Sequence, residues 1–181
     1  MGARKPRTLE AEALWDYALR VVGGRAQSTG ELRAKLRLRA QRAADVDEVI
    51  GRMKDRGYLD DRRFAESFTA GRIENQGFGR SRVLRDLRAR RVAPAVAEQV
   101  VRKAYEDVDE PRLIEDFLSR KYRKIPLKEF LAEPKNLAAA YRRLRLAGFS
   151  SGNVIRALKR YANEADELEA MEAPEGEERS L

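Results

Sequence analysis

The sequence contains no cysteine and no histidine among its 181 residues. The absence of cysteine excludes disulfides, thiolate nucleophiles and cysteine-based zinc sites. The absence of histidine excludes histidine-dependent catalytic triads and HExxH zinc motifs, and it removes the usual general base at neutral pH. We therefore expect a protein that is not an enzyme and has no catalytic residue, metal or other cofactor.

Long apolar runs are also absent. No run approaches the ~20 residues that a membrane-spanning helix needs, and residues 1–12 lack the apolar stretch of a secretory signal. A P-loop motif is missing, and residues 77–79 (Gly-Phe-Gly) contain too few glycines for a dinucleotide-binding motif and are interpreted as a turn. We expect a cytoplasmic protein with no membrane contact.

Positive charge is abundant and unevenly placed. The net charge is +8, but residues 162–181 contain eight acidic residues and one Arg, so residues 1–161 carry a net +15. A body this basic predicts a nucleic acid or an acidic protein surface as the partner. The acidic tail has two interpretations: it keeps the protein in solution, or it competes within the molecule for the basic surface.

Helix signals occur along most of the chain, whereas alternating strand patterns of useful length do not. Ser28 and Glu31 form a capping box, and Asp45 with Glu48 predicts a second helix start of the same kind. Other predicted starts are Asp60, Pro94, Asp109, Pro134 and Ser150. The sequence therefore predicts an all-α fold.

An internal repeat organises these helices. A shift of 51 residues aligns Leu36 and Arg37 with Leu87 and Arg88, and a further shift of 57 aligns them with Leu144 and Arg145. We predict three tandem three-helix repeats, about nine helices in an elongated array whose curvature stays open. The predicted segments are an N-terminal arm (1–11), repeat 1 (12–58), repeat 2 (59–107), repeat 3 (108–161) and an acidic tail (162–181), partly helical to Leu168 or disordered.

Several of these residues closely resemble the RecX family of regulatory proteins. The resemblance covers roughly residues 12–161 and rests on three motifs: Arg25-x-x-Ser28-x-x-Glu31-Leu32-x-x-Lys35-Leu36, Gly57-Tyr58-Leu59-Asp60-Asp61-x-x-Phe64-Ala65 and Gly79-x-x-Arg82-Val83-x-x-x-Leu87. The sequence departs from the family pattern after the second helix of repeats 1 and 2, where Ala40 and Arg91 replace an expected glycine and make the helix ends less predictable.

The resemblance implies regulation of the RecA recombinase in DNA repair and the SOS response. Members of this family bind in the groove of the RecA–DNA filament, inhibit its ATPase and strand exchange, and in many cases bind DNA. The expected partners are thus the RecA filament, single-stranded DNA and, as a second candidate, double-stranded DNA, bound by a monomer. Composition alone leaves an alternative open, a stand-alone basic DNA-binding protein or transcription regulator that uses helix 80–91 for recognition.

Clusters of cations in each repeat are the candidate contacts with RecA or DNA. Helix 80–91 has Asp86 as its only acid, and a Tyr lies among four cations at residues 120–124, a pattern typical of single-strand binding. The alternatives are a solvated face, an Arg that braces each repeat, and a buried Tyr. The candidates are Arg37, Arg82, Arg85, Arg88, Arg90, Arg91, Arg120, Lys121, Tyr122, Arg123, Lys124, Arg142, Arg143 and Arg145.

Asp60 and Asp61 are the only paired carboxylates worth testing as a metal site. Two adjacent ligands with no third nearby form a weak magnesium site. Because a helix is predicted to start here, both side chains are better explained by capping and by attraction to the helix dipole. Tyr58, Leu59 and Phe64 around them are interpreted as packing between repeats 1 and 2.

Overall fold

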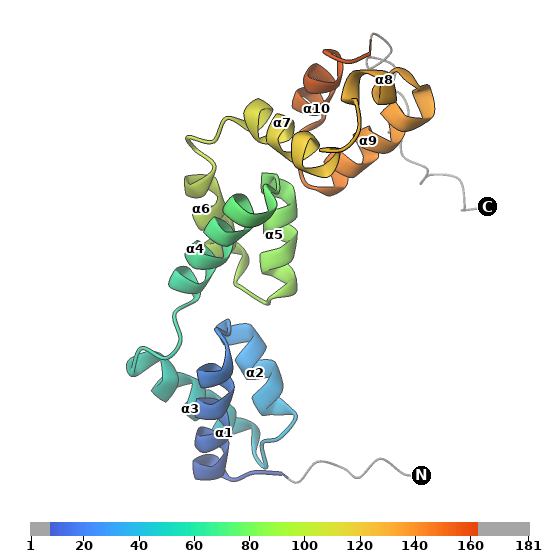
Figure 1. The fold of residues 1–181 in the computed structure, drawn as a ribbon. Coiled ribbons are helices and arrows are strands. Elements are labelled where there is room, and N and C mark those ends of the chain that lie inside the picture. The colour runs from blue at the N-terminus through green and yellow to red at the C-terminus, as the bar shows by residue number, and fades with distance from the viewer. Residues whose placement is uncertain (1–7, 163–181) are drawn as a thin grey trace, which may run out of the picture. The chain divides into compact units, whose positions relative to one another are not determined.

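The computed structural model describes residues 8–162, and within this range the chain is helical (Figure 1). The described residues contain no β-strand, only an isolated bridge between Leu9 and Ala40. The all-α prediction is confirmed. No helix within residues 8–162 is long and apolar enough to cross a bilayer. The acidic tail after Ala162 and most of the N-terminal arm lie outside the described residues.

The described residues contain ten α-helices and one π-helical segment, one α-helix more than the nine predicted. The additional helix is α8, which is bounded by Pro126 at its N-cap and by Pro134, where α9 begins. The elements are α1 (Ala11–Gly24), α2 (Thr29–Arg37), α3 (Ala43–Asp55), α4 (Asp61–Gly71), η1 (Arg72–Gln76), α5 (Arg80–Ala89), α6 (Pro94–Ala104), α7 (Glu110–Lys121), α8 (Leu127–Ala132), α9 (Pro134–Leu146) and α10 (Ser151–Leu158).

These elements form two compact units. Within the described residues, unit 1 comprises the chain up to Ala70 together with Leu84–Ala104, and unit 2 comprises Gly71–Val83 together with the chain after Ala104. The boundary between the units runs through helix α5, inside the predicted middle repeat. The segment around η1 therefore packs with the third set of helices rather than with its own neighbours in sequence.

The first core lies among α1, α2 and α3 of unit 1. The apolar stripe of α3, predicted from the spacing of Val46, Val49, Ile50 and Met53, is buried along its whole length. It packs with Leu14, Trp15 and Ala18 of α1 and with Leu32 and Leu36 of α2. Because an amphipathic helix gains most of its stability from burying such a stripe, each of these helices depends on the other two.

Local capping was predicted correctly at one helix and wrongly at another. At α2 the Glu31 N–H donates to Ser28 Oγ at 3.0 Å and the Ser28 N–H donates to Glu31 Oε2 at 3.3 Å, so the capping box is confirmed. At α3 the predicted cap, Asp45, is wrong: the helix begins at Ala43, and the buried Asp45 carboxylate pairs with Arg42 at 2.7 Å. The ion pair satisfies the carboxylate inside the first turn.

The segment between α4 and α5 belongs to the core of unit 2. Phe78 packs against a buried cluster built by α7, α9 and α10, which includes Ile114, Leu144 and Phe149. The Tyr105 hydroxyl donates to the Phe78 carbonyl at 2.6 Å, and burial together with the nearby Glu110 raises the pKa of this tyrosine. Gly77 has a φ of +61°, which confirms the predicted turn.

One joint between helices occurs in unit 1, where the start of α2 meets the end of α5. The Ser28 hydroxyl donates to the Arg90 carbonyl, and Gly30 lies so close to the Arg91 backbone that a Cβ at this position would overlap it. The positive end of the α2 dipole therefore faces the carbonyls at the end of α5, an arrangement that stabilises both termini.

A matching joint occurs in unit 2, where the start of α5 meets the end of α9. The Gly79 N–H donates to the Ala147 carbonyl at 2.8 Å, and the Ser81 N–H donates to the Gly148 carbonyl at 3.2 Å. The repeat offsets of 51 and 57 relate all four residues to those of the first joint. The sequence repeat thus corresponds to a repeated backbone contact.

The residue that ends the second helix explains one departure from the family pattern. Arg91 adopts a φ of +56° and its repeat equivalent Gly148 a φ of +96°, so both have the left-handed backbone that favours glycine. At the first-repeat equivalent, Ala40, the chain instead forms the bridge with Leu9. Arg91 therefore retains the backbone conformation of the expected glycine at a cost of about 1–2 kcal/mol.

Candidate nucleic-acid interface

The basic helix α5 buries Val83 and Leu87 and directs its arginines away from them. Arg82 lies over the Phe78 ring, with its guanidinium 5.3 Å from the ring centroid, and Arg88 pairs with Glu98 at 3.2 Å. Arg85 is exposed. Arg82 and Arg88 are thus already engaged with neighbouring groups of the protein.

The Arg pair at the end of α5 belongs largely to the joint with α2. Arg90 pairs with Glu31 at 2.7 Å and stacks over Phe64 and Phe68, with its guanidinium 5.2 and 5.7 Å from their centroids. Arg91 is exposed, but its backbone is held against Gly30. Arg90 is therefore a bracing residue in this structure, one of the alternatives considered for these arginines.

The three arginines at equivalent repeat positions do not share one role. Arg37 is exposed and makes no ion pair with another residue in the described range. Arg88 pairs with Glu98, whereas Arg145 donates to the Phe149 carbonyl at 2.6 Å and so binds the chain that follows α9. A common bracing role would require a common partner, and within residues 8–162 Arg37 has no ion pair that would correspond to that of Arg88.

Tyr122 is part of the core, which corrects its interpretation as a stacking platform. Its side chain is only 7% exposed, its ring centroid lies 5.3 Å from that of Phe130, and its hydroxyl accepts a hydrogen bond from Arg143 at 3.0 Å. A base could reach this ring only if the core of unit 2 opened. We therefore remove Tyr122 from the candidate contacts, and Arg143 is partly committed to it.

The cations around Tyr122 differ in what they contact. Arg120 donates to the Asp116 carbonyl at 3.2 Å and to the Asn75 carbonyl at 3.5 Å, so it holds η1 against α7. Four other cations, at the end of α7, in the loop that follows it and on α9, are exposed and make no ion pair with any residue among 8–162. These four, here called the α7–α9 basic surface, are Lys121, Arg123, Lys124 and Arg142.

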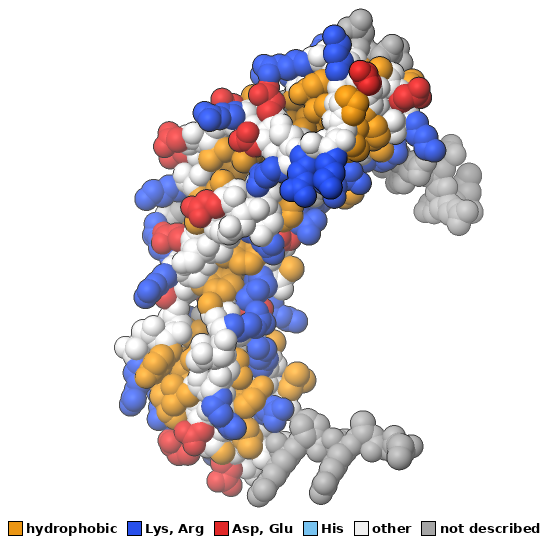
Figure 2. Space-filling model, viewed as in Figure 1, with side chains coloured by type: hydrophobic (Ala, Val, Ile, Leu, Met, Phe, Trp, Pro, Cys, Tyr) orange, Lys and Arg blue, Asp and Glu red, His pale blue; other side chains and the backbone are white. Residues whose placement is uncertain are grey.

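Figure 2 shows a dense group of lysine and arginine side chains over the α7 and α9 part of unit 2. These cations keep their attraction for phosphates, because no carboxylate among residues 8–162 has to be displaced first. The α7–α9 basic surface is therefore better suited to nucleic acid than the arginines of α5.

Asp60 and Asp61 both accept hydrogen bonds from helix starts. Asp60 Oδ1 accepts from the Arg63 N–H at 2.9 Å in its own helix, whereas Asp61 Oδ1 accepts from the Thr29 N–H at 2.7 Å, at the start of α2. No group of three or more acidic side chains in the described part of the chain is placed to hold a metal ion. The structure thus supports the capping interpretation, and it adds a link between α4 and α2 that sequence spacing did not indicate.

Replacing Asp61 by Ala is expected to lower the free energy of unfolding by about 1–2 kcal/mol, because the buried Thr29 N–H loses its acceptor. Asp61→Asn retains an acceptor and should recover most of this loss. Thermal unfolding followed by circular dichroism measures both. A Mg²⁺-dependent stabilisation of the parent protein that disappears in Asp61→Asn would contradict capping and support a metal site.

Sequence reasoning missed a second group of residues, at the connection between α3 and α4. Tyr58 was assigned to packing, and its ring does lie edge-on to that of Trp15, with centroids 6.2 Å apart, but its side chain is still 51% exposed. The exposed Arg63 of α4 lines the same cavity. The only sequence signal is the position of Tyr58 directly after Gly57, whose φ of +72° ends α3 and turns the chain outward. Burial at such a turn depends on the neighbouring helices.

Comparison with known proteins identifies relatives over most of the chain. A model of the family described as "RecX, second three-helix domain" matches residues 60–101, which contain α4, α5 and most of α6. The "Regulatory protein RecX" of Deinococcus radiodurans is 32% identical over 163 residues, which cover 88% of this chain and 74% of that protein. The protein of the same name from Trichlorobacter lovleyi is 33% identical over 105 residues, covering 58% of this chain and 68% of that one.

Solved structures share the fold. The crystal structure of RecX from Lactobacillus salivarius superimposes with a TM-score of 0.63 at 16% sequence identity, covering 83% of this chain and 96% of that chain. A second structure, titled "Crystal structure of regulatory protein RecX", gives the same TM-score at 18% identity, and the superposition covers 73% of that chain. At these identities the likeness concerns the arrangement of helices.

Proposed function

Because the chain belongs to the RecX family of regulatory proteins, we propose that it binds the RecA–DNA filament and inhibits the ATPase, recombinase and strand-exchange activities of RecA in DNA repair and the SOS response. The observation that carries the proposal is the similarity to the Deinococcus radiodurans protein, which extends over 88% of this chain. The relatives are named as regulatory proteins, which agrees with the prediction that the chain is not an enzyme.

Inhibition of this kind needs no catalytic group. A ligand that binds one conformation of a filament more tightly than another shifts the population toward the first, by no more than the difference in its affinities. A tenfold preference for a filament state with slow ATP turnover corresponds to about 1.4 kcal/mol. Helical units with exposed cations can provide such a preference through contacts with protein and phosphate.

DNA contact is the second part of the proposal. Two features support binding of single-stranded DNA, with duplex DNA as a weaker ligand: the net +15 of residues 1–161, and the four cations of the α7–α9 basic surface, which make no ion pair within residues 8–162. We keep the monomeric state and the cytoplasmic location as expectations. The same cations also favour the alternative candidate, a stand-alone DNA-binding protein or transcription regulator.

The test is ATP hydrolysis by RecA on single-stranded DNA while this protein is titrated in. We expect strong inhibition at amounts well below one molecule per RecA protomer. The reason is that a regulator that contacts several neighbouring RecA subunits affects all of them at once. Inhibition that begins only when the protein saturates the DNA would favour the stand-alone DNA binder. Unchanged hydrolysis at every ratio would remove the proposed function.

A further inference from the structure

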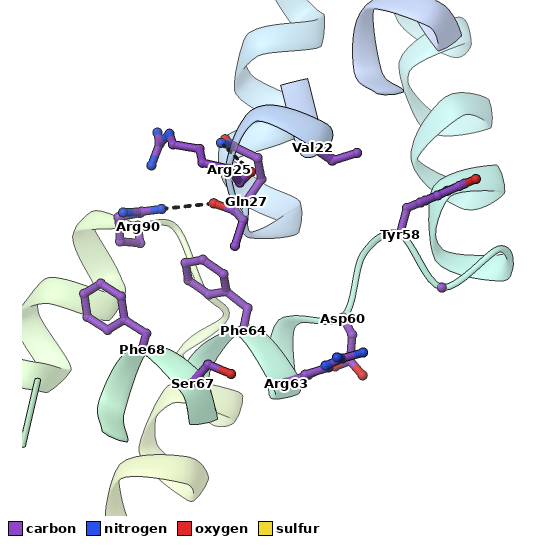
Figure 3. Close-up of a pocket in the computed structure, with 12 residues that line it drawn as sticks. Val22, Arg25, Gln27, Tyr58, Asp60, Arg63, Phe64, Ser67, Phe68 and Arg90 are labelled. Carbon is purple, nitrogen blue, oxygen red and sulfur yellow. Dashed lines mark hydrogen bonds between the residues drawn. The ribbon is translucent and has the colours of Figure 1, made fainter. Parts of the chain in front are cut away.

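A cavity of about 620 Å³ lies within unit 1, beside the joint between α2 and α5. Its walls are the end of α1 and the loop that follows, the connection from α3 to α4, one face of α4, and Arg90 (Figure 3). The volume falls in the range of about 300–1,000 Å³ that is typical of small-molecule sites. The cavity is therefore large enough for more than a single amino-acid side chain.

Aromatic rings line two sides of this cavity. Tyr58, on the α3–α4 connection, is 51% exposed, and on the α4 side the rings of Phe64 and Phe68 are stacked with their centroids 6.0 Å apart. Burying such rings would stabilise the fold, so an exposed tyrosine beside a cavity has apolar surface left to bury against a ligand. The Arg90 guanidinium already lies over the Phe64 and Phe68 rings, so the exposed ring of Tyr58 offers the faces on which a planar group can stack.

Cations surround the same space. Arg90 is fixed in place by Glu31 and by the two phenylalanine rings. Arg25 is 54% exposed and makes only a long ion pair of 3.6 Å with the same Glu31, and Arg63 is exposed without an ion pair to any described residue. The Glu31 carboxylate is shared between Arg90 and Arg25 and lies nearer to Arg90. The guanidinium groups of Arg25 and Arg63 are therefore available to an anion.

From the combination of stacking faces and available guanidinium groups, we propose that the cavity binds one unstacked base of single-stranded DNA together with its phosphate. A stacked base adds about 1–3 kcal/mol of binding free energy, and an arginine fork matches the oxygens of a phosphate. A base within a duplex cannot enter, because its faces are covered by its neighbours. The proposal deepens the DNA contact in the proposed function and rests on it.

An occupant of the cavity would also affect how the helices of unit 1 are held together. Its walls come from α1 and α3 on one side and from α4 and the end of α5 on the other, so an occupant contacts both groups of helices. A bound base would stabilise this joint in the arrangement that the structure has, since a ligand favours the conformation that binds it.

Photo-crosslinking tests the occupant directly. A single-stranded oligonucleotide that carries 5-iodouracil is irradiated with the full-length protein, and the crosslinked peptides are identified by mass spectrometry. We expect crosslinks in the segment that contains Tyr58, Phe64 and Phe68. Tyr58→Leu, which alters an exposed side chain, should lower affinity for the oligonucleotide about tenfold and leave affinity for a duplex of the same sequence unchanged.

A matched pair on α4 tests the phosphate contact. Arg63→Gln removes a cation of the cavity wall, whereas Arg62→Gln removes the neighbouring cation, which pairs with Glu66 outside the cavity. Both variants lose the same charge, but only Arg63→Gln should weaken single-strand binding by more than about threefold and reduce the salt dependence of binding beyond the control.

Four results would overturn the proposal. Crosslinks found only outside the cavity, or wild-type single-strand affinity in Tyr58→Leu, would remove the base as occupant. Unchanged DNA binding in Tyr58→Leu with loss of RecA inhibition would assign the cavity to a protein side chain. A protein that binds no single-stranded DNA yet inhibits RecA would disprove this site while leaving the proposed regulation intact.

Discussion

Replacing Gly148 by Ala is expected to lower the free energy of unfolding by about 3 kcal/mol, the largest effect among the single substitutions considered. The residue has a φ of +96°, and a Cβ there would lie 2.6 Å from the Cβ of Arg82 and 2.7 Å from the Gly79 carbonyl oxygen. Backbone strain of about 1–2 kcal/mol and overpacking of about 1–3 kcal/mol combine at this position. Thermal unfolding should show a Tm lower by roughly 6–12 °C.

Gly152→Ala provides the control for Gly148→Ala. Gly152 lies in the first turn of α10 in the same unit, and a Cβ there would meet nothing within 4 Å. The alanine should leave the Tm unchanged or raise it slightly, because it restricts the unfolded chain. Equal stability of the two variants would mean that the joint between α5 and α9 does not restrict Gly148 as the structure indicates.

Loss of the α7–α9 basic surface is expected to have the largest effect on DNA binding. We predict that the triple variant Lys121→Gln, Arg123→Gln and Lys124→Gln weakens single-stranded DNA binding about 100-fold at ~0.1 M salt. The reason is counterion release: each lost phosphate contact removes about 0.7 from the slope of log affinity against log salt concentration. A salt titration by fluorescence anisotropy should therefore give a slope smaller by about 2.

The matched control is a triple variant of exposed cations outside the candidate contacts, Arg102→Gln, Lys103→Gln and Arg112→Gln. It removes the same charge from the whole protein, so it measures the effect of net charge alone. If both triple variants lose the same affinity, DNA binds through the general field of the protein rather than through the α7–α9 basic surface. Circular dichroism should show the same helix content in both.

Much of the candidate interface could not be predicted from the sequence, because a cation is available to DNA only when no other group of the protein engages it. The sequence pointed to α5, where Asp86 is the only acid, but Glu98 of α6 and the Phe78 ring engage Arg88 and Arg82. Glu98 lies 10 residues from Arg88 and becomes its neighbour only because α6 turns back on α5, whereas Phe78 lies four residues before Arg82 and is a local partner. The loop after α7 contains more cations without such partners.

Features that depend on local interactions could be predicted from the sequence alone. The capping box at Ser28, the apolar stripe of α3 and the helix starts at Asp60, Pro94 and Asp109 all follow from residues within one or two turns. The family resemblance, confirmed by relatives of the same name, depends on motifs of the same short range. Helical class and repeat spacing are therefore already present in the linear pattern.

Which side chains are buried, paired or left available depends on the tertiary structure. The core position of Tyr122, the left-handed backbone of Arg91 and the cavity beside Tyr58 all depend on residues that approach from other helices or on how the chain turns between them. Burial and pairing are set by contacts between distant segments, and a periodic pattern specifies which face of a helix is apolar without specifying what covers it.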